Sequence, residues 1–248
     1  MEEEHVRFVD IVTLNTPLRE VVASIRREIG LSVEQQLQAG NRDQLFKLIR
    51  ERIEQARVFV LLVGDLGSYH STIQPETFRG YAIADDFAPF IVINDNDAKS
   101  AHTFTLLHEL THIFAGSTGV SSETAFTLQD RVLPIERFCN AVAAELLMPE
   151  GRFREAWWGA QAVALPDKVE ELANYWNVSR AAVAYRLLRV GQIEHGEWEA
   201  LHQRYIDEWR AQRQRARETH RERGRPQLLR RETQQIGSRP AFNSQKLY

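Results

Sequence analysis

Apolar residues in the first quarter of the chain recur three and four positions apart, which is the spacing of one helix face. A first helix is expected with Thr16 as its N-terminal cap and Pro17 at its first helical position, and it is expected to end at Gly30. A second helix is expected after Asn41, its N-terminal cap. The apolar positions of these two helices are Leu18, Val21, Val22 and Ile25, then Leu45, Leu48, Ile49 and Ile53.

Short apolar stretches separated by turn residues then predict a small sheet of about three strands. Residues 58–63 form an uninterrupted apolar run, which is typical of a buried strand. Residues 77–84 and 90–94 are expected to form two further strands on either side of the turn signal Asp85-Asp86.

Helical spacing returns after this sheet. Helices are expected at about residues 100–115, 134–148, 166–176 and 179–190, with a loop over residues 117–133. This order of helices, small sheet and helices predicts an α+β fold, because alternating βαβ units would be needed for a parallel α/β sheet.

The bulk composition is that of a globular protein, with 43% hydrophobic residues and a formal net charge of −3. This balance gives no overall attraction to nucleic acid or to an anionic membrane. From about residue 201, however, arginine becomes frequent and apolar residues become rare. The change predicts an exposed basic helix that frays into a tail.

The chain has one cysteine, Cys139, which rules out an intrachain disulfide and a metal site built on several thiolates. A single thiol is typical of a reducing cytoplasm. The N-terminus MEEEHVRFVDIV lacks the features of a signal peptide, and no apolar run approaches the roughly 20 residues of a membrane span. We therefore expect a cytoplasmic protein with no membrane partner.

The candidate chemistry lies in the segment His108-Glu109-Leu110-Thr111-His112. On a helix, this HExxH spacing puts the two histidines one turn apart on the same face, where both imidazoles can bind one Zn²⁺. Glu109 would then lie close enough to act on a metal-bound water. The alternative is a pair of histidines in ordinary surface or hydrogen-bonded contacts.

Zinc hydrolysis with two histidines requires a third protein ligand and one open position for water. The best candidate is Glu136, at the start of the helix expected over residues 134–148, with Asn140 one turn later to hydrogen-bond a ligand. An acid that is stabilised by the helix dipole is the alternative role of Glu136. The ligand types favour zinc, with Mn²⁺ or Fe²⁺ as alternatives. Rival ligands are His102, Glu123 and Asp130.

Residues 104–116, FTLLHELTHIFAG, and residues 135–149, IERFCNAVAAELLMP, together resemble the ImmA/IrrE-type metallopeptidases of bacteria and mobile elements. Residues 77–82 and 88–94 resemble the strand pair that precedes the zinc helix of that family, and the resemblance covers about residues 20–190. It implies that zinc is bound by His108, His112 and Glu136, and that Glu109 is the catalytic glutamate.

The resemblance also implies a substrate. Members of this family typically cleave a helix-turn-helix repressor or antitoxin that is encoded beside them, and many carry such a domain at their own N-terminus. This chain has none there, so we expect its regulator to be a separate protein. The expected domains are a zincin-like metallopeptidase domain over residues 1–155, a helical helix-turn-helix-like subdomain over residues 156–200 and an arginine-rich helix or tail over residues 201–248.

In the expected mechanism, Glu109 accepts a proton as the zinc-bound water attacks a peptide carbonyl, then passes it to the leaving amine. The strand at residues 90–94 would offer an edge to an extended substrate. Arg79 and Tyr185 are weak candidates for stabilising the oxyanion. A salt bridge for Arg79 and a core position for Tyr185 are the alternatives.

Residues 172–183 resemble a helix-turn-helix, in which Arg180, Arg186 and Arg189 would face DNA. The basic tail could also contact nucleic acid through counterion release. These features support an alternative function, a DNA-binding regulator or toxin–antitoxin component with a non-hydrolytic metal site. The favoured interpretation of the segment is a helical lid packed on the peptidase core through Leu172, Val183, Leu187 and Leu188.

Overall fold

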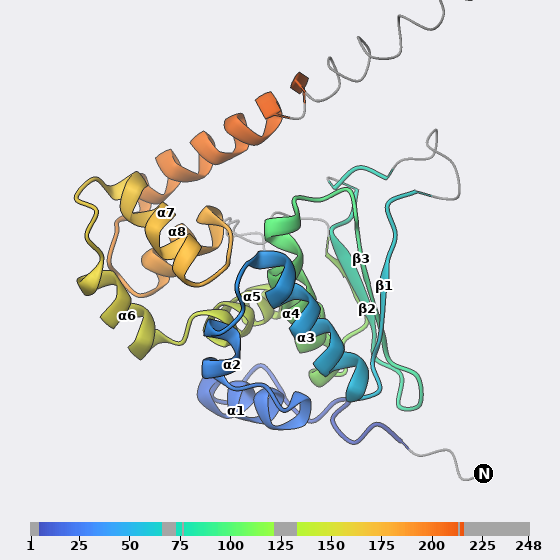
Figure 1. Cartoon of the computed structure of the whole chain (residues 1–248). Coiled ribbons are helices and arrows are strands. Elements are labelled where there is room, and N and C mark those ends of the chain that lie inside the picture. The colour runs from blue at the N-terminus through green and yellow to red at the C-terminus, as the bar shows by residue number, and fades with distance from the viewer. Residues whose placement is uncertain (1–4, 66–72, 76, 122–132, 213, 216–248) are drawn as a thin grey trace, which may run out of the picture. The chain divides into compact units, whose positions relative to one another are not determined.

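The computed structural model describes residues 5–65, 73–75, 77–121, 133–212 and 214–215 (Figure 1). Contacts divide the chain into two units, Met1–Leu201 and His202–Tyr248, which are considered separately. In the second unit, residues 202–212 are helical. The first unit contains all the candidate site residues that the structure describes.

Three helices precede the sheet, namely α1 (Leu18–Ile29), α2 (Val33–Leu37) and α3 (Arg42–Gln55). The predicted end of α1 at Gly30 and the predicted start of α3 at Asn41 are confirmed, whereas α1 starts one residue later than predicted, with Pro17 and not Thr16 at the N-cap position. Gly30 closes α1 in the left-handed conformation at φ 59°. Asn41 caps α3, where its side-chain oxygen accepts a hydrogen bond from the Gln44 backbone N–H over 2.9 Å. The short α2 was not predicted, because it has too few residues to show a period. The buried apolar residues of α1 and α3 are Val21, Ile25, Ile29, Leu45, Ile49 and Ile53.

Four strands form one sheet in the order β1-β3-β2-β4. They are β1 (Phe59–Leu62), β2 (Gly80–Ile83), β3 (Phe90–Ile93) and β4 (Gly119–Ser121). β1 pairs with β3 in parallel, whereas β2 pairs with both β3 and β4 in antiparallel. The predicted α+β class is confirmed. The extra strand, β4, lies in the segment predicted to be a loop, because three residues without an apolar run carry no strand signal.

The strand at the predicted substrate edge is an interior strand. β3 hydrogen-bonds to β1 on one side and to β2 on the other. The prediction that residues 90–94 pair with a substrate is therefore wrong, because both sides of that backbone are occupied. The edges of the described sheet are β1 and β4.

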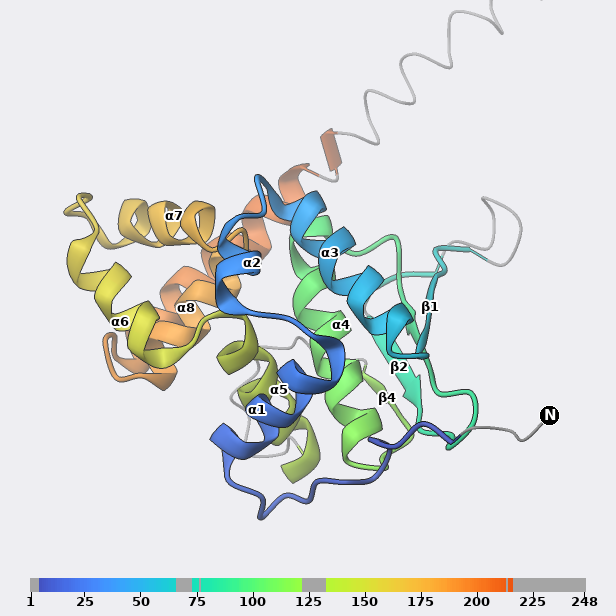
Figure 2. The same cartoon turned by 60° about the horizontal axis from the view of Figure 1, so that its bottom comes forward.

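The helix that carries the HExxH segment is the centre of the core. α4 (Lys99–Phe114) lies on the same face of the sheet as α3 (Figure 1) and packs between the sheet and α5 (Pro134–Leu147) (Figure 2). Every residue of α4 from His102 to Phe114 is buried. Its burial on all sides means that polar residues on this helix must find their partners inside the protein. The buried residues of β1, β2 and β3 are Val60, Gly80, Ala82, Ile91, Val92 and Ile93.

The N-terminal segment closes the C-terminal end of α4. The backbone N–H groups of Asp10 and Ile11 donate to the carbonyls of Ile113 and Phe114, over 3.2 and 2.9 Å. These bonds satisfy carbonyl groups that a helix end otherwise leaves without partners. The Phe8 ring stacks on Phe114 with 4.7 Å between centroids. The end of the site helix is thus fixed by a segment about a hundred residues earlier in the chain.

Three helices follow, α6 (Glu150–Gly159), α7 (Leu165–Tyr175) and α8 (Arg180–Arg189). Arg186 of α8 is only 4% exposed and forms an ion pair with Glu145 of α5. The idea that Arg186 faces DNA is therefore wrong, because its guanidinium is used inside the protein. Arg180 pairs with Glu170 over 3.4 Å. Apolar residues of the predicted lid are buried, namely Leu172, Val183 and Leu187.

The predicted boundary between residues 155 and 156 falls inside α6, and the division of the first unit into two domains stays a prediction. Among the helices that the structure describes, none has both the length and the hydrophobicity that a bilayer span requires.

Candidate metal centre

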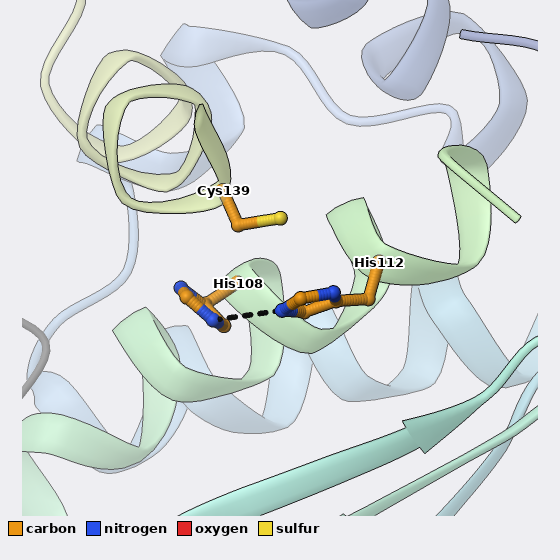
Figure 3. Close-up of side chains that lie close together, drawn as sticks. All are labelled: His108, His112 and Cys139. Carbon is orange, nitrogen blue, oxygen red and sulfur yellow. Dashed lines mark hydrogen bonds between the residues drawn. The ribbon is translucent and has the colours of Figure 1, made fainter. Parts of the chain in front are cut away.

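Two imidazoles of α4 meet inside the protein. His108 and His112 are 3% and 1% exposed, and their Nε2 atoms lie 3.1 Å apart. They are adjacent because residues four apart on a helix share a face. Figure 3 shows the two rings side by side above α4.

Glu136 of α5 approaches both rings. Its Oε2 lies 3.1 Å from His108 Nε2, and its Oε1 lies 3.2 Å from His112 Nε2. Pro134 starts α5 and places Glu136 in its first turn. The structure therefore brings together all three residues that the sequence proposed as metal ligands.

The ionisation states suit a metal. Burial lowers the pKa of His108 and favours its neutral form. Burial alone would raise the pKa of Glu136, but hydrogen bonding and charge interaction with the two histidines outweigh it and lower this pKa to about 2. A neutral imidazole beside an ionised carboxylate is the pair of states that cation binding requires.

Asn140 fixes which nitrogen of His108 carries the proton. Its Oδ1 lies 2.9 Å from His108 Nδ1, and an amide oxygen only accepts, so Nδ1 is the donor. The lone pair of His108 Nε2 then points toward Glu136 and His112. The predicted contact between Asn140 and a candidate ligand is thus present, and it is the contact that orients metal-binding histidines in proteins.

Glu109 is fully buried, next to the first residue of β2. A Cβ built on Gly80 would lie 2.9 Å from Glu109 Oε1 and 3.0 Å from its Cγ. Real Cβ atoms essentially never come within 3.0 Å of another heavy atom, so glycine lets β2 pass this close to the glutamate without a shift of either. The contact between Gly80 and Glu109 was not predicted, because a single glycine in a strand does not indicate which residue lies opposite it.

The rival residues lie elsewhere or outside the described chain. His102 lies six residues before His108 on α4, its ring is tilted against that of Phe46 with centroids 5.7 Å apart, and burial lowers its pKa. Glu123 and Asp130 lie outside the described residues.

The two candidates for stabilising the oxyanion both occupy the alternative positions considered for them. Arg79 Nη1 forms a 2.7 Å salt bridge with Asp97 Oδ2, the alternative given for it. Tyr185 is 4% exposed, and burial raises the pKa of its phenol. Its core position likewise matches the alternative role.

Cys139 lies at the site, although it was not among the predicted site residues. Figure 3 shows it reaching from α5 toward the two imidazoles, and its Sγ and donor atoms of His108 and His112 all lie within 4.8 Å of one another. Burial, then the charges of Glu136 and Glu109, raises the pKa of this thiol. The helical spacing could have predicted this position, because Cys139 is three residues after Glu136 and shares its helix face.

Comparison with known proteins agrees with this geometry. The profile of a peptidase family, described as the IrrE N-terminal-like domain, matches residues 63–188. The chain belongs to this family. The predicted ImmA/IrrE resemblance is thereby confirmed, and with it a place among metallopeptidases. A search of curated proteins finds no match.

The donor set fits a divalent cation. Donor atoms bound to Zn²⁺ at about 2.0–2.1 Å in a tetrahedral site are separated by about 3.3–3.4 Å. The three separations among His108, His112 and Glu136 are 3.1, 3.1 and 3.2 Å. They differ from the tetrahedral spacing by only a few tenths of an ångström, so little rearrangement is needed to hold an ion.

Proposed function

We propose that this member of the IrrE-like peptidase family is a zinc-dependent endopeptidase with His108, His112 and Glu136 as metal ligands and Glu109 as general base. One observation supports this most directly. The Nε2 atoms of His108 and His112 and the carboxylate of Glu136 converge from two helices to separations of 3.1–3.2 Å. Two imidazoles and one carboxylate brought this close inside the protein are the donors that a divalent cation binds.

The donor types favour zinc over other divalent ions. Two imidazoles and one carboxylate are a common catalytic zinc set, which leaves one position open. Mn²⁺ and Fe²⁺ accept the same donors and are the alternatives. His112 presents Nε2 to the same point, where it lies 3.1 Å from His108 Nε2 and 3.2 Å from Glu136 Oε1.

The reaction uses a proton acceptor beside the ion. A bound cation polarises the peptide carbonyl and acidifies a coordinated water. Glu109 accepts the proton of the attacking water and delivers it to the amine that leaves. Gly80 keeps the carboxylate of Glu109 in place by leaving room for it under β2.

The proposed substrate is a helix-turn-helix repressor or antitoxin encoded beside this chain, as a separate protein in a cytoplasmic two-gene system. One support is the family membership. The other is that α7 and α8 do not present their arginines as a set of exposed side chains for contacting DNA. Two of the three arginines considered for DNA binding, Arg180 and Arg186, are held in ion pairs. These ion pairs disfavour the alternative of a DNA-binding regulator, because such a protein needs free arginine side chains to contact the phosphates and base edges of DNA.

The test combines metal analysis with cleavage. The purified chain should contain about one zinc per molecule and should cut the neighbouring regulator during incubation. Glu109→Gln should keep its zinc and lose about 10²–10⁴-fold in cleavage rate, because only the base is removed. Undiminished cleavage by Glu109→Gln would refute the base assignment. A chain without bound metal, or salt-sensitive DNA binding with no cleavage, would refute the peptidase proposal.

A further inference from the structure

The only cysteine of the chain lies beside the two histidines and is completely buried. It reaches them from the same helix face as Glu136 (Figure 3). A buried cysteine can act simply as a small apolar residue. Here, however, the nearest groups include two metal-binding side chains, and the sulfur and both imidazoles fall within 4.8 Å of one another.

Cysteine sulfur is a common zinc donor, with Zn–S bonds of about 2.3 Å and Zn–N bonds of about 2.0–2.1 Å, which put sulfur and nitrogen about 3.6 Å apart in a tetrahedral site. The sulfur and the two imidazole nitrogens lie within 4.8 Å of one another, so sharing one ion requires the sulfur to move toward the rings by up to about an ångström. Glu136 lies three residues before Cys139, so the carboxylate and the sulfur extend from the same face of α5.

We propose that Cys139 is a fourth protein ligand, and that its thiolate occupies the coordination position that the reacting water needs. This inference rests on the metal site of the proposed function. When the thiol of Cys139 binds the ion, its Sγ–H bond breaks, the proton passes to solvent, and an Sγ–metal bond forms. No oxidant or reductant takes part.

Four protein donors change the class of the site. Zinc sites with four protein ligands are closed, and catalytic sites keep one position open. In the resting protein the sulfur therefore competes with the reacting water for the ion, and cleavage is slower than it would be with this position open. A thiolate also makes the site softer, which favours thiophilic ions such as Zn²⁺ and Cd²⁺ over Mn²⁺.

The experiment uses the full chain loaded with Co²⁺, which reports sulfur ligation by an intense thiolate-to-cobalt charge-transfer absorption in the near ultraviolet. Wild type should show this band, and both Cys139→Ala and Cys139→Ser should lose it. Glu136→Gln is the matched control on the same helix face, because it removes a carboxylate and leaves the sulfur. Its Co²⁺ complex should retain the band.

Two further measurements accompany the spectrum. In competition with a chelator, Cys139→Ala should bind Zn²⁺ at least about tenfold more weakly, since even the loss of an outer contact to a ligand costs 10–100-fold. Its cleavage of the neighbouring regulator should be faster than that of wild type. Thermal unfolding of both cysteine variants checks that they are folded.

The outcomes separate this inference from the proposed function. If wild type binds one Co²⁺ but gives the same spectrum as Cys139→Ala, the sulfur is not a ligand, and the peptidase site with its three ligands stands. If neither protein binds Co²⁺ or Zn²⁺, the metal site itself is wrong, and the role of Cys139 fails with it. Slower cleavage by Cys139→Ala, despite the loss of the band, would contradict the competition of the sulfur with the reacting water.

Discussion

The side-chain oxygen of Asn140 accepts a hydrogen bond from Nδ1 of His108 over 2.9 Å, across the interface between α5 and α4. Asn140 touches no substrate and is a positioning residue, since it fixes the ring and leaves Nε2 to bind a metal. Asn140→Ala should therefore bind Zn²⁺ about 10–100-fold more weakly, with little change in cleavage rate once the site is saturated.

A chelator competition titration measures this affinity. Asn140→Asp keeps an acceptor oxygen at the same place and should restore much of the binding. Equal Zn²⁺ affinity in wild type and Asn140→Ala would show that the orientation of His108 does not depend on this contact.

Gly80 offers a test of how Glu109 is positioned. In Gly80→Ala, the new methyl group would lie 2.8 Å from Thr105 Cγ2 and 2.9 Å from Glu109 Oε1, so β2 or these side chains must shift, and we expect Glu109 to be displaced. A displacement near 1 Å at a reacting group can cost about 100-fold in rate. We expect a fall of that order in kcat, with unchanged zinc content by metal analysis.

Gly119→Ala is the matched control, because it makes the same change in neighbouring β4, where a Cβ meets nothing within 4 Å. It should keep near wild-type kcat. If both variants lose activity equally, the loss reflects disturbance of the sheet and not of Glu109.

The carboxyl group of Glu136 predicts a pH dependence of stability in the metal-free protein. Its pKa is about 2 in the fold, compared with an ordinary value of 4.5. Because the fold favours the ionised form, this stabilisation is complete above about pH 4.5 and is lost as the pH falls toward about 2.

Chelator-treated wild type should therefore lose more free energy of unfolding between about pH 5 and about pH 3 than Glu136→Gln, as measured by urea unfolding. The difference is a fraction of the full linkage value, because a quarter of the Glu136 side chain is exposed. Parallel losses in both proteins would mean that Glu136 is not held ionised by the histidines.

The ion pair between Arg186 and Glu145 predicts a structural role for α8. Arg186→Ala leaves the carboxylate of Glu145, whose side chain is 20% exposed, without its guanidinium and should lower the free energy of unfolding by about 1–3 kcal/mol. Arg180→Ala removes a half-exposed pair with Glu170 and should cost only about 0–1 kcal/mol. Urea unfolding measures both, and similar small losses would indicate that α8 is not anchored through Arg186.

Local sequence carried most of the information on which elements form. Helix periodicity, Asn41 and Gly30 located α1 and α3, and the four-residue spacing of His108 and His112 placed both on one face of α4. These features depend on neighbours three or four residues away, so the sequence contains their cause.

Only the tertiary structure decided which segments meet. It made β3 an interior strand, added β4, buried Arg186 against Glu145 and brought Cys139 to the histidines. Each of these results depends on contacts between residues far apart in the chain or on different elements, which pairing and packing select. The sequence by itself determined the helix that carries the chemistry, and the packing of α5 on that helix decided which side chains complete the site.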